Sequence, residues 1–148
     1  MSYPTALVLA LLVGVLVTVQ AGMLARMQVT LGSGLFPALA SFAGGTAALL
    51  AYILAVRAEW PSTAAAAQVP GWLWLAGAVG AFFMVLLIVL APRLGAGTLM
   101  ALIVAGQLAA ALMLDHFGAL GFAHQPLSLA KLAGATLIVV GASLVQYK

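Results

Sequence analysis

The side chains of this sequence that could bind a small molecule are amides and hydroxyls set inside long apolar stretches. They are Gln20, Ser41, Thr46, Thr98 and Gln107. A buried amide without a partner costs a few kcal/mol, so Gln107 has to face protein or water. It either lines a cavity and binds substrate there, or forms a hydrogen bond to a neighbouring helix. The same alternatives apply to Gln20, and the three hydroxyls could instead bond to carbonyls of their own helices.

A second polar group ends the fourth apolar stretch, where Asp115 is followed by His116. A carboxylate at the C-terminal end of a helix opposes the helix dipole and needs another stabilising partner. Lys131, at the start of the next stretch, is the simplest one, and Arg26 and Arg93 of an oppositely oriented second copy could also reach it. We favour an interfacial ion pair. Proton coupling through Asp115 or His116 is the alternative.

Other kinds of chemistry have no support in the sequence. There is no cysteine, and His116 and His124 have no third ligand near them, so we expect no metal site and no cofactor. We find neither paired carboxylates nor a nucleophile with a nearby base, and we predict that the protein is not an enzyme. The five lysines and arginines are too scattered to form a nucleic-acid surface.

The composition requires a lipid environment for the stretches that carry these residues. Of the 148 residues, 66% are hydrophobic and 5% are charged, which is too little polar surface to cover a globule in water. Crossing a hydrocarbon core takes about 20 apolar helical residues. The sequence therefore predicts an all-α membrane protein, with residues 1–148 as a single domain of five transmembrane helices: 4–25, 34–56, 71–91, 96–116 and 129–147.

Local signals set the boundaries of these helices. Arg26 and the following "LGSG" are expected to end the first helix. Pro92 cannot continue a helix and Gly95 tolerates the turn, so "APRLGAG" predicts a tight reversal between the third and fourth helices. Ser128 is the predicted N-cap of the fifth. The N-terminal stretch has no cationic leader and is expected to be a retained span and not a cleaved signal.

Small residues recur along two of the predicted helices at helical spacing. Such positions let helix backbones approach closely, which is the main packing device in lipid. We therefore predict helix packing at Gly14, Thr18, Gly22, Gly97, Ala101, Ala105 and Ala109.

The cations give the membrane little reason to prefer one orientation. With five spans, Arg57 and Lys131 lie on the face that holds the N-terminus, and the opposite face holds Arg26, Arg93 and Lys148. The positive-inside rule needs a clear excess on one side. We therefore predict that the chain inserts in both orientations and pairs as an antiparallel homodimer. A single orientation, fixed by the small excess or by a partner, is the alternative.

Several segments carry a resemblance to a known family. They are "QAGMLARMQVTLGSGL", "SFAGGT", "GAFFMVLLIVLAPRLGAGTLMALIVAGQLAAALMLDHFG" and "PLSLAKLAGATLIVVGASLV". The chain resembles the bacterial YdcZ-type inner-membrane proteins, a branch of the drug/metabolite transporter superfamily. The resemblance implies one five-helix repeat of the drug/metabolite (EamA-like) type and a place in the bacterial inner membrane. Small multidrug exporters carry a glutamate in their first helix where this chain has Gln20, so their proton exchange is not implied.

Together these observations predict a small-molecule transporter. Five helices correspond to one repeat, and alternating access commonly uses two inverted repeats around a site at the midplane. The expected partners are membrane lipid, a second copy of the chain, and a small organic or amphiphilic metabolite or drug. The alternative is a non-transporting scaffold or regulatory subunit. A long polar tail or docking loop would favour this alternative, and the sequence shows neither.

Overall fold

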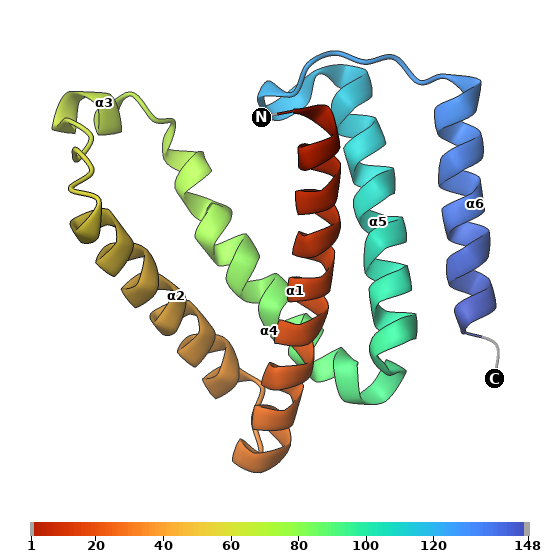
Figure 1. The fold of residues 1–148 in the computed structure, drawn as a ribbon, viewed down its shortest axis with the longest axis horizontal. Helices are drawn as coiled ribbons and strands as arrows, with labels where there is room; N and C mark the ends of the chain where they lie inside the picture. Colours follow the sequence, from red (N-terminus) through yellow and green to blue (C-terminus); the bar gives the residue numbers. More distant parts are fainter. Residues whose placement is uncertain (1, 147–148) are drawn as a thin grey trace. The chain divides into compact units, whose positions relative to one another are not determined.

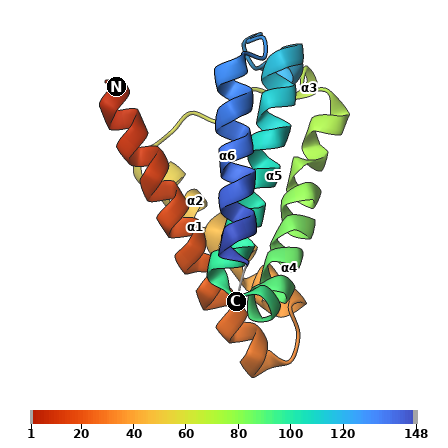
Figure 2. The same ribbon diagram turned by 90° about the vertical axis from the view of Figure 1, so that its right-hand side faces the viewer.

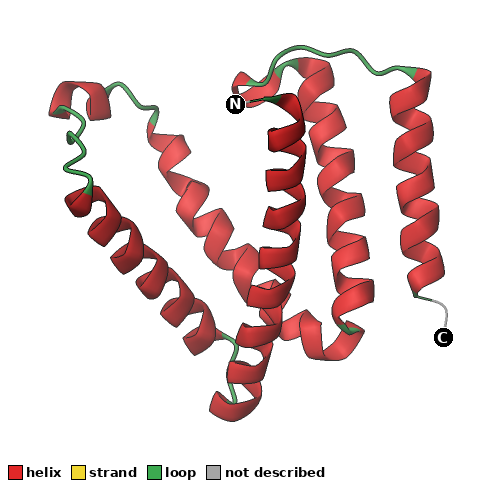
Figure 3. Cartoon of the chain, viewed as in Figure 1, coloured by secondary structure: helices red, strands yellow, loops and turns green. Residues whose placement is uncertain are grey.

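The computed structural model describes residues 2–146 and consists of helices joined by short loops (Figure 3). No β-strand occurs in this part of the chain, which confirms the predicted all-α class. In chain order (Figure 1), the elements are α1 (Tyr3–Leu31), α2 (Leu35–Ala55), α3 (Thr63–Ala67), the 3-10 helix η1 (Gly71–Leu75), α4 (Ala76–Leu94), α5 (Ala96–Phe117), the 3-10 helix η2 (Ala119–Gly121) and α6 (Leu129–Val145).

Four helical segments are long and apolar enough to cross a membrane. They are Tyr3–Leu31, Leu35–Ala55, Gly71–Leu94 and Ala96–Phe117. The protein is therefore a multi-pass membrane protein. Helix α6 is also apolar but has 17 residues, about 25 Å at the rise of an α-helix against a hydrocarbon core of about 30 Å. The predicted fifth span, 129–147, is thus a shorter helix, and its last residue lies outside the described part of the chain.

The first helix is longer than the sequence predicts. Its start follows the usual rules, since the Ser2 side chain accepts a hydrogen bond from the Thr5 amide. It does not end at Arg26 but continues to Leu31, because arginine is a good helix former and leaving the hydrocarbon does not require the helix to stop. Gly32, with φ +68°, ends it, and its N–H donates to the Gln28 carbonyl at 2.8 Å.

Pro92 lies inside α4 and does not stop it, contrary to the prediction. The helix continues through Arg93 to Leu94. In the last turn the missing proline N–H removes one hydrogen bond from a helix that is about to end. The reversal then occurs at Gly95, whose φ of +76° and ψ of 157° belong to a region that is nearly restricted to glycine.

The chain divides into two compact units, Met1–Pro92 and Arg93–Lys148. In the first unit the buried side chains come from three helices: Ala21, Leu24, Pro37, Ala38, Leu87 and Ile88. Gly34 allows α2 to begin close to α4, because a Cβ there would lie 3.0 Å from Val89 Cγ2. Farther along, a Cβ on Gly80 of α4 would lie 3.6 Å from the Phe42 ring of α2.

In the second unit, α5 and α6 pack side by side in antiparallel directions (Figures 1 and 2). A Cβ on Gly97 at the start of α5 would lie 3.6 Å from Val145 Cγ1 at the end of α6. Leu99 and Ala142 are the buried residues of this pair. Ser128 caps α6 as predicted, accepting a hydrogen bond from the Lys131 amide at 3.2 Å.

Most large apolar side chains of the long helices are exposed in the single chain. Leu11, Val29 and Leu137, from three regions of the sequence, are 72–75% exposed. Exposing this much apolar surface to water would be very unfavourable, so lipid or another polypeptide must cover it. The few buried residues hold the helices together, and the remaining helix faces are free to contact other molecules.

Candidate functional site

Gln107 lies at the centre of α5, and its amide has no hydrogen-bond partner in the described part of the chain. The helix has 22 residues, about 33 Å, which matches the thickness of the hydrocarbon core and puts its midpoint next to Gln107. The side chain is exposed, and it forms no hydrogen bond with any residue from 2 to 146. At this depth lipid offers no hydrogen bond, so the amide needs a polar partner or water.

The surface around Gln107 leaves room for such a contact. Ala110 and Ala111, one turn along the helix, are both exposed. A Cβ added to the preceding Gly106 would meet no atom within 4 Å. The amide therefore stands among small residues on an open helix face, where a ligand or a second helix can approach the backbone closely.

Gln20 and Ser41, both proposed from the sequence to line a cavity, are joined to each other. The Gln20 Nε2 atom donates to Ser41 Oγ at 3.0 Å, which links α1 to α2. One N–H and the carbonyl oxygen of the Gln20 amide remain available. The sequence left open whether Gln20 binds substrate or bonds to a neighbouring helix. Ser41 is a partner for the second of these roles.

Six further serine and threonine hydroxyls in the long helices fall into two sets. Four of them donate to the carbonyl four residues earlier in their own helix: Thr18, Thr30, Thr136 and Ser143. Thr46, which is exposed, and Thr98, which is half-buried, form no hydrogen bond among the described residues. These two hydroxyls retain their capacity to bind a ligand or a second copy of the chain.

Asp115, His116 and Lys131 come together at the loop between α5 and α6. The Asp115 backbone carbonyl accepts hydrogen bonds from the amides of Gly118 (3.3 Å) and Gln125 (2.8 Å). Lys131 Nζ donates to the Gln125 side-chain oxygen at 3.1 Å. No ion pair involving Asp115 occurs in residues 2–146. Lys131, the cation that the sequence predicted as the partner of Asp115, thus bonds to Gln125 instead.

His116 fixes the end of this loop. Its Nδ1 atom accepts a hydrogen bond from the Leu127 amide at 3.4 Å. Its ring packs edge-on against Phe117, with centroids 5.0 Å apart, and lies 6.3 Å from the ring of His124. Gly118, with φ +60°, lets the loop turn back so closely that a Cβ there would lie 3.4 Å from His124 Cβ. This arrangement closes the loop over the end of α5.

The predicted small-residue positions have different surroundings on the two helices. On α5, Gly97 lies against Val145, while Ala101 and Ala105 are half-buried and Ala109 is exposed. On α1, a Cβ at Gly14 or Gly22 would meet no atom within 4 Å, and Thr18 bonds to the Gly14 carbonyl. The α1 positions therefore lie on an open surface of the chain.

Gln28 is a polar residue that the sequence analysis did not single out. Its Oε1 atom is buried and has no hydrogen-bond partner among the described residues. The residue follows Arg26 and was assigned to a loop, because the first span was expected to end there. Its spacing could have indicated a helical position, because Gln28 lies four residues after Leu24 and seven after Ala21, on the same helix face as these two buried residues.

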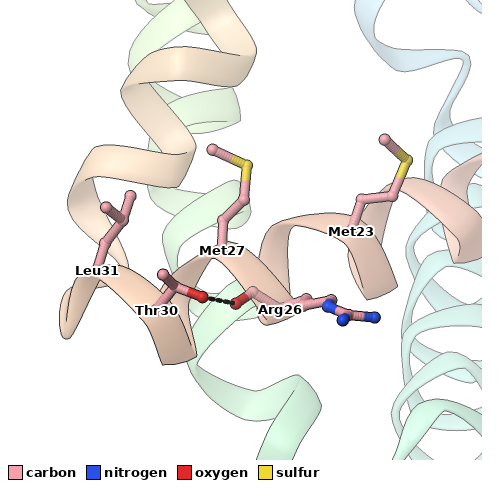
Figure 4. Close-up of a pocket in the computed structure, with 5 residues that line it drawn as sticks. All are labelled: Met23, Arg26, Met27, Thr30 and Leu31. Atoms are coloured by element: carbon pink, nitrogen blue, oxygen red, sulfur yellow. Dashed lines mark hydrogen bonds between the residues drawn. The ribbon is translucent and has the colours of Figure 1, made fainter.

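A groove runs along α1 next to Arg26 (Figure 4). It has a volume of about 470 Å³ and is lined by Met23, Arg26, Met27, Thr30 and Leu31. A second cavity of about 370 Å³ continues along the same helix and is lined by Val13, Leu16, Val17, Val19, Gln20 and Met23. Arg26 is the single charged side chain among these residues.

Within residues 2–146, no group of three or more histidine, cysteine, aspartate or glutamate side chains is arranged to hold a metal ion.

A protein-family model matches most of the chain. It covers residues 5–144, and its description is "Putative inner membrane exporter, YdcZ". No curated protein and no solved structure gives a match. The matched range includes all six α-helices apart from the first two residues of α1 and the last residue of α6.

Proposed function

Because the chain belongs to the YdcZ family of inner-membrane exporters, we propose that it moves small organic or amphiphilic molecules across the bacterial inner membrane. It does so by alternating access as an antiparallel homodimer. In this proposal α6 crosses the membrane as the fifth span, since 17 mostly apolar residues are at the lower limit for a transmembrane helix.

The observation that carries the proposal is the unpartnered amide of Gln107 at the centre of an apolar helix. An amide exposed to hydrocarbon would cost a few kcal/mol, and a residue kept there at that cost is a functional candidate. Small neighbours leave room for a ligand beside it. Gln107 is therefore proposed to bind substrate at the midplane, where transporters built from inverted repeats place their sites. Thr46 and Thr98, whose hydroxyls are unpartnered among the described residues, are the next candidates.

A second copy in the opposite orientation would supply the second, inverted repeat. One chain provides a single repeat, and alternating access by inverted repeats needs two. The open surface of α1 at Gly14 and Gly22 offers a place for close helix packing between copies. Asp115 would then obtain a cationic partner from Arg93 of the other copy, and Gln20 and Ser41 would serve to hold α1 against α2.

The positions of the charges indicate the kind of substrate. Arg26, Arg93 and Asp115 all lie in the last two turns of their helices, away from the midplane. A strongly charged substrate would need a counter-charge inside the membrane. We therefore propose cargo that is uncharged or weakly charged, with apolar or aromatic groups that fit a cavity lined by amides and hydroxyls.

The test is transport by purified protein in proteoliposomes, using a panel of labelled, uncharged or zwitterionic aromatic compounds, with and without a pH gradient. For a compound that wild type transports, Gln107→Leu should lower the rate about tenfold or more, since a lost hydrogen bond of roughly 1.4 kcal/mol corresponds to a factor of ten. Gln107→Asn keeps an amide and should retain part of the activity. The dimer content of each variant is measured by light scattering.

Two results would contradict the proposal. Normal transport by Gln107→Leu would exclude Gln107 from the pathway. A panel in which no compound moves faster than in empty liposomes would favour a scaffold or regulatory subunit instead. An effect of the pH gradient on transport would point to proton coupling, for which Asp115 and His116 are the residues to substitute next.

A further inference from the structure

The groove on α1 has one charged group and a strongly apolar wall. Met23, Met27 and Leu31 form the wall and are 38–64% exposed. Figure 4 shows the Arg26 side chain extending away from the helix beside them. The Thr30 hydroxyl donates to the Arg26 backbone carbonyl at 3.3 Å, so its proton is already used. The guanidinium therefore supplies the free hydrogen-bond donors of the groove.

Arg26 has no acidic partner among residues 2–146. It is exposed and forms no ion pair with any residue from 2 to 146. A guanidinium group presents five N–H donors in a planar fork that fits a phosphate with two parallel hydrogen bonds. The groove thus offers a binding site for an anionic head and an apolar surface for a tail.

The depth of Arg26 indicates which anion it meets. From Thr5 to Ala25, α1 has no charged residue, and such a length covers about 30 Å, the thickness of the hydrocarbon core. Arg26 follows directly, so its guanidinium lies at the level of the lipid headgroups. Phosphate groups of phospholipids are concentrated at this level.

The second cavity continues the groove in the direction that an acyl chain would take. The two cavities share Met23, and the lining residues 13, 16, 20, 23, 27 and 30 repeat at intervals of three and four, which places them on one helix face. From Met23 to Val13 the helix rises about 15 Å, half of the hydrocarbon thickness and thus the depth of one leaflet. The Gln20 amide within this path is bonded to Ser41.

We propose that this face of α1 is a binding site for one anionic membrane phospholipid. Its phosphate binds the Arg26 guanidinium, and an acyl chain lies along Met23 towards Val13. The site depends on α1 crossing the membrane and not on transport. It would hold even if the transport function proposed above were wrong.

The test compares lipid binding by purified full-length protein in detergent. Native mass spectrometry measures retention of dioleoyl phosphatidylglycerol against dioleoyl phosphatidylcholine, and thermal unfolding gives the change in Tm with each lipid. Wild type should retain phosphatidylglycerol about tenfold better, as expected for roughly 1.4 kcal/mol of charge-assisted hydrogen bonding. Arg26→Gln should abolish this preference.

Arg93→Gln is the matched control. It removes the same charge near the end of another transmembrane helix, and Arg93 lines neither cavity on α1. Any general attraction between a basic protein and an anionic lipid is reduced equally in both variants. The preference should therefore persist in Arg93→Gln. Equal loss in the two variants, or an unchanged preference in Arg26→Gln, would overturn the proposal.

Two further arms separate a lipid site from a site for a free anion. Inorganic phosphate and dihexanoyl phosphatidylglycerol carry the anionic group with no chain or a short one. Both should raise the Tm much less than the long-chain lipid, because the chain contacts along α1 are missing. A Tm increase as large as that with the dioleoyl lipid would assign the groove to small anions and refute the lipid assignment.

Discussion

Gln20 and Gln107 both lie in apolar helices, but they differ in their hydrogen-bond partners. The Gln20 amide meets Ser41 on α2 at 3.0 Å, whereas the Gln107 amide meets no described residue. Both would cost free energy if left against lipid. The first is stabilised by a neighbouring helix, and the second forms no hydrogen bond among the described residues. For this reason Gln107 is the centre of the proposed site and Gln20 is assigned a structural role.

The bond between Gln20 and Ser41 can be measured by a double-mutant cycle. The variants Gln20→Leu, Ser41→Ala and the combination of both are unfolded reversibly in mixed micelles. The coupling free energy should be about 0.6 kcal/mol and no more than roughly 1.7 kcal/mol, as found for hydrogen bonds between membrane helices. Thr46→Ala, at a hydroxyl with no partner among the described residues, should show no coupling to Gln20→Leu.

A different outcome would return Gln20 to the substrate pathway. If Gln20→Leu leaves the free energy of unfolding unchanged and transport is lost, the residue acts on substrate and not on helix packing. Zero coupling between the two substitutions would also mean that the interhelical bond contributes nothing in the membrane.

Among the elements, the reversal between α4 and α5 depends on one backbone conformation. Gly95 has φ +76° and ψ 157°, in a region where a side chain would clash with the backbone. Pro92 lies three residues earlier and does not terminate α4, which ends at Leu94. The turn is therefore set by the glycine and not by the proline.

The same substitution at two glycines should have opposite effects. Gly95→Ala should lower the free energy of unfolding by about 1–3 kcal/mol, because alanine would be strained in this conformation. Gly77→Ala is the control, since Gly77 lies inside α4 and a Cβ there meets no atom within 4 Å. It should raise the free energy of unfolding by up to about 1 kcal/mol, through the higher helix propensity of alanine. Equal effects at both positions would show that the backbone conformation of Gly95 is not required.

At the scale of the whole molecule, few residues are buried and many large apolar side chains are exposed. The buried residues lie at a few helix contacts, and large side chains such as Leu11 remain 75% exposed. Such a surface is satisfied by lipid or by further protein contacts. In the five-span arrangement that we propose, the cations are divided nearly equally between the two faces, which is the physical basis for the proposed antiparallel pairing.

Orientation can be measured with C-terminal reporter fusions. A fluorescent protein that matures in the cytoplasm and a phosphatase that is active in the periplasm should both give signal with the wild-type chain. Ala64→Lys adds a positive charge to the exposed helix α3. The substitution should increase the fraction of molecules that have this loop in the cytoplasm. If α6 crosses the membrane, the C-terminus of these molecules lies in the periplasm, and phosphatase activity should rise relative to fluorescence. We expect a change of roughly fivefold, for about 1 kcal/mol per lysine.

The two reporters test dual orientation and the crossing of the membrane by α6 separately. Signal from one side alone in the wild type would refute dual orientation. A rise in fluorescence with Ala64→Lys would show instead that both termini lie on the same face, and hence that α6 does not cross.

The sequence by itself determined the class of the protein and most of its helices, because long apolar runs can be satisfied only as helices in lipid. It also predicted Ser128 as a cap, which depends on local chemistry alone. The tertiary structure decided which polar groups meet. The pairing of Gln20 with Ser41 depends on how α1 and α2 are placed against each other, and residue spacing within one helix carries no information on that. The length of α1 beyond Arg26, and with it the groove and Gln28, was missed because a charge marks where a helix leaves the hydrocarbon and not where it ends.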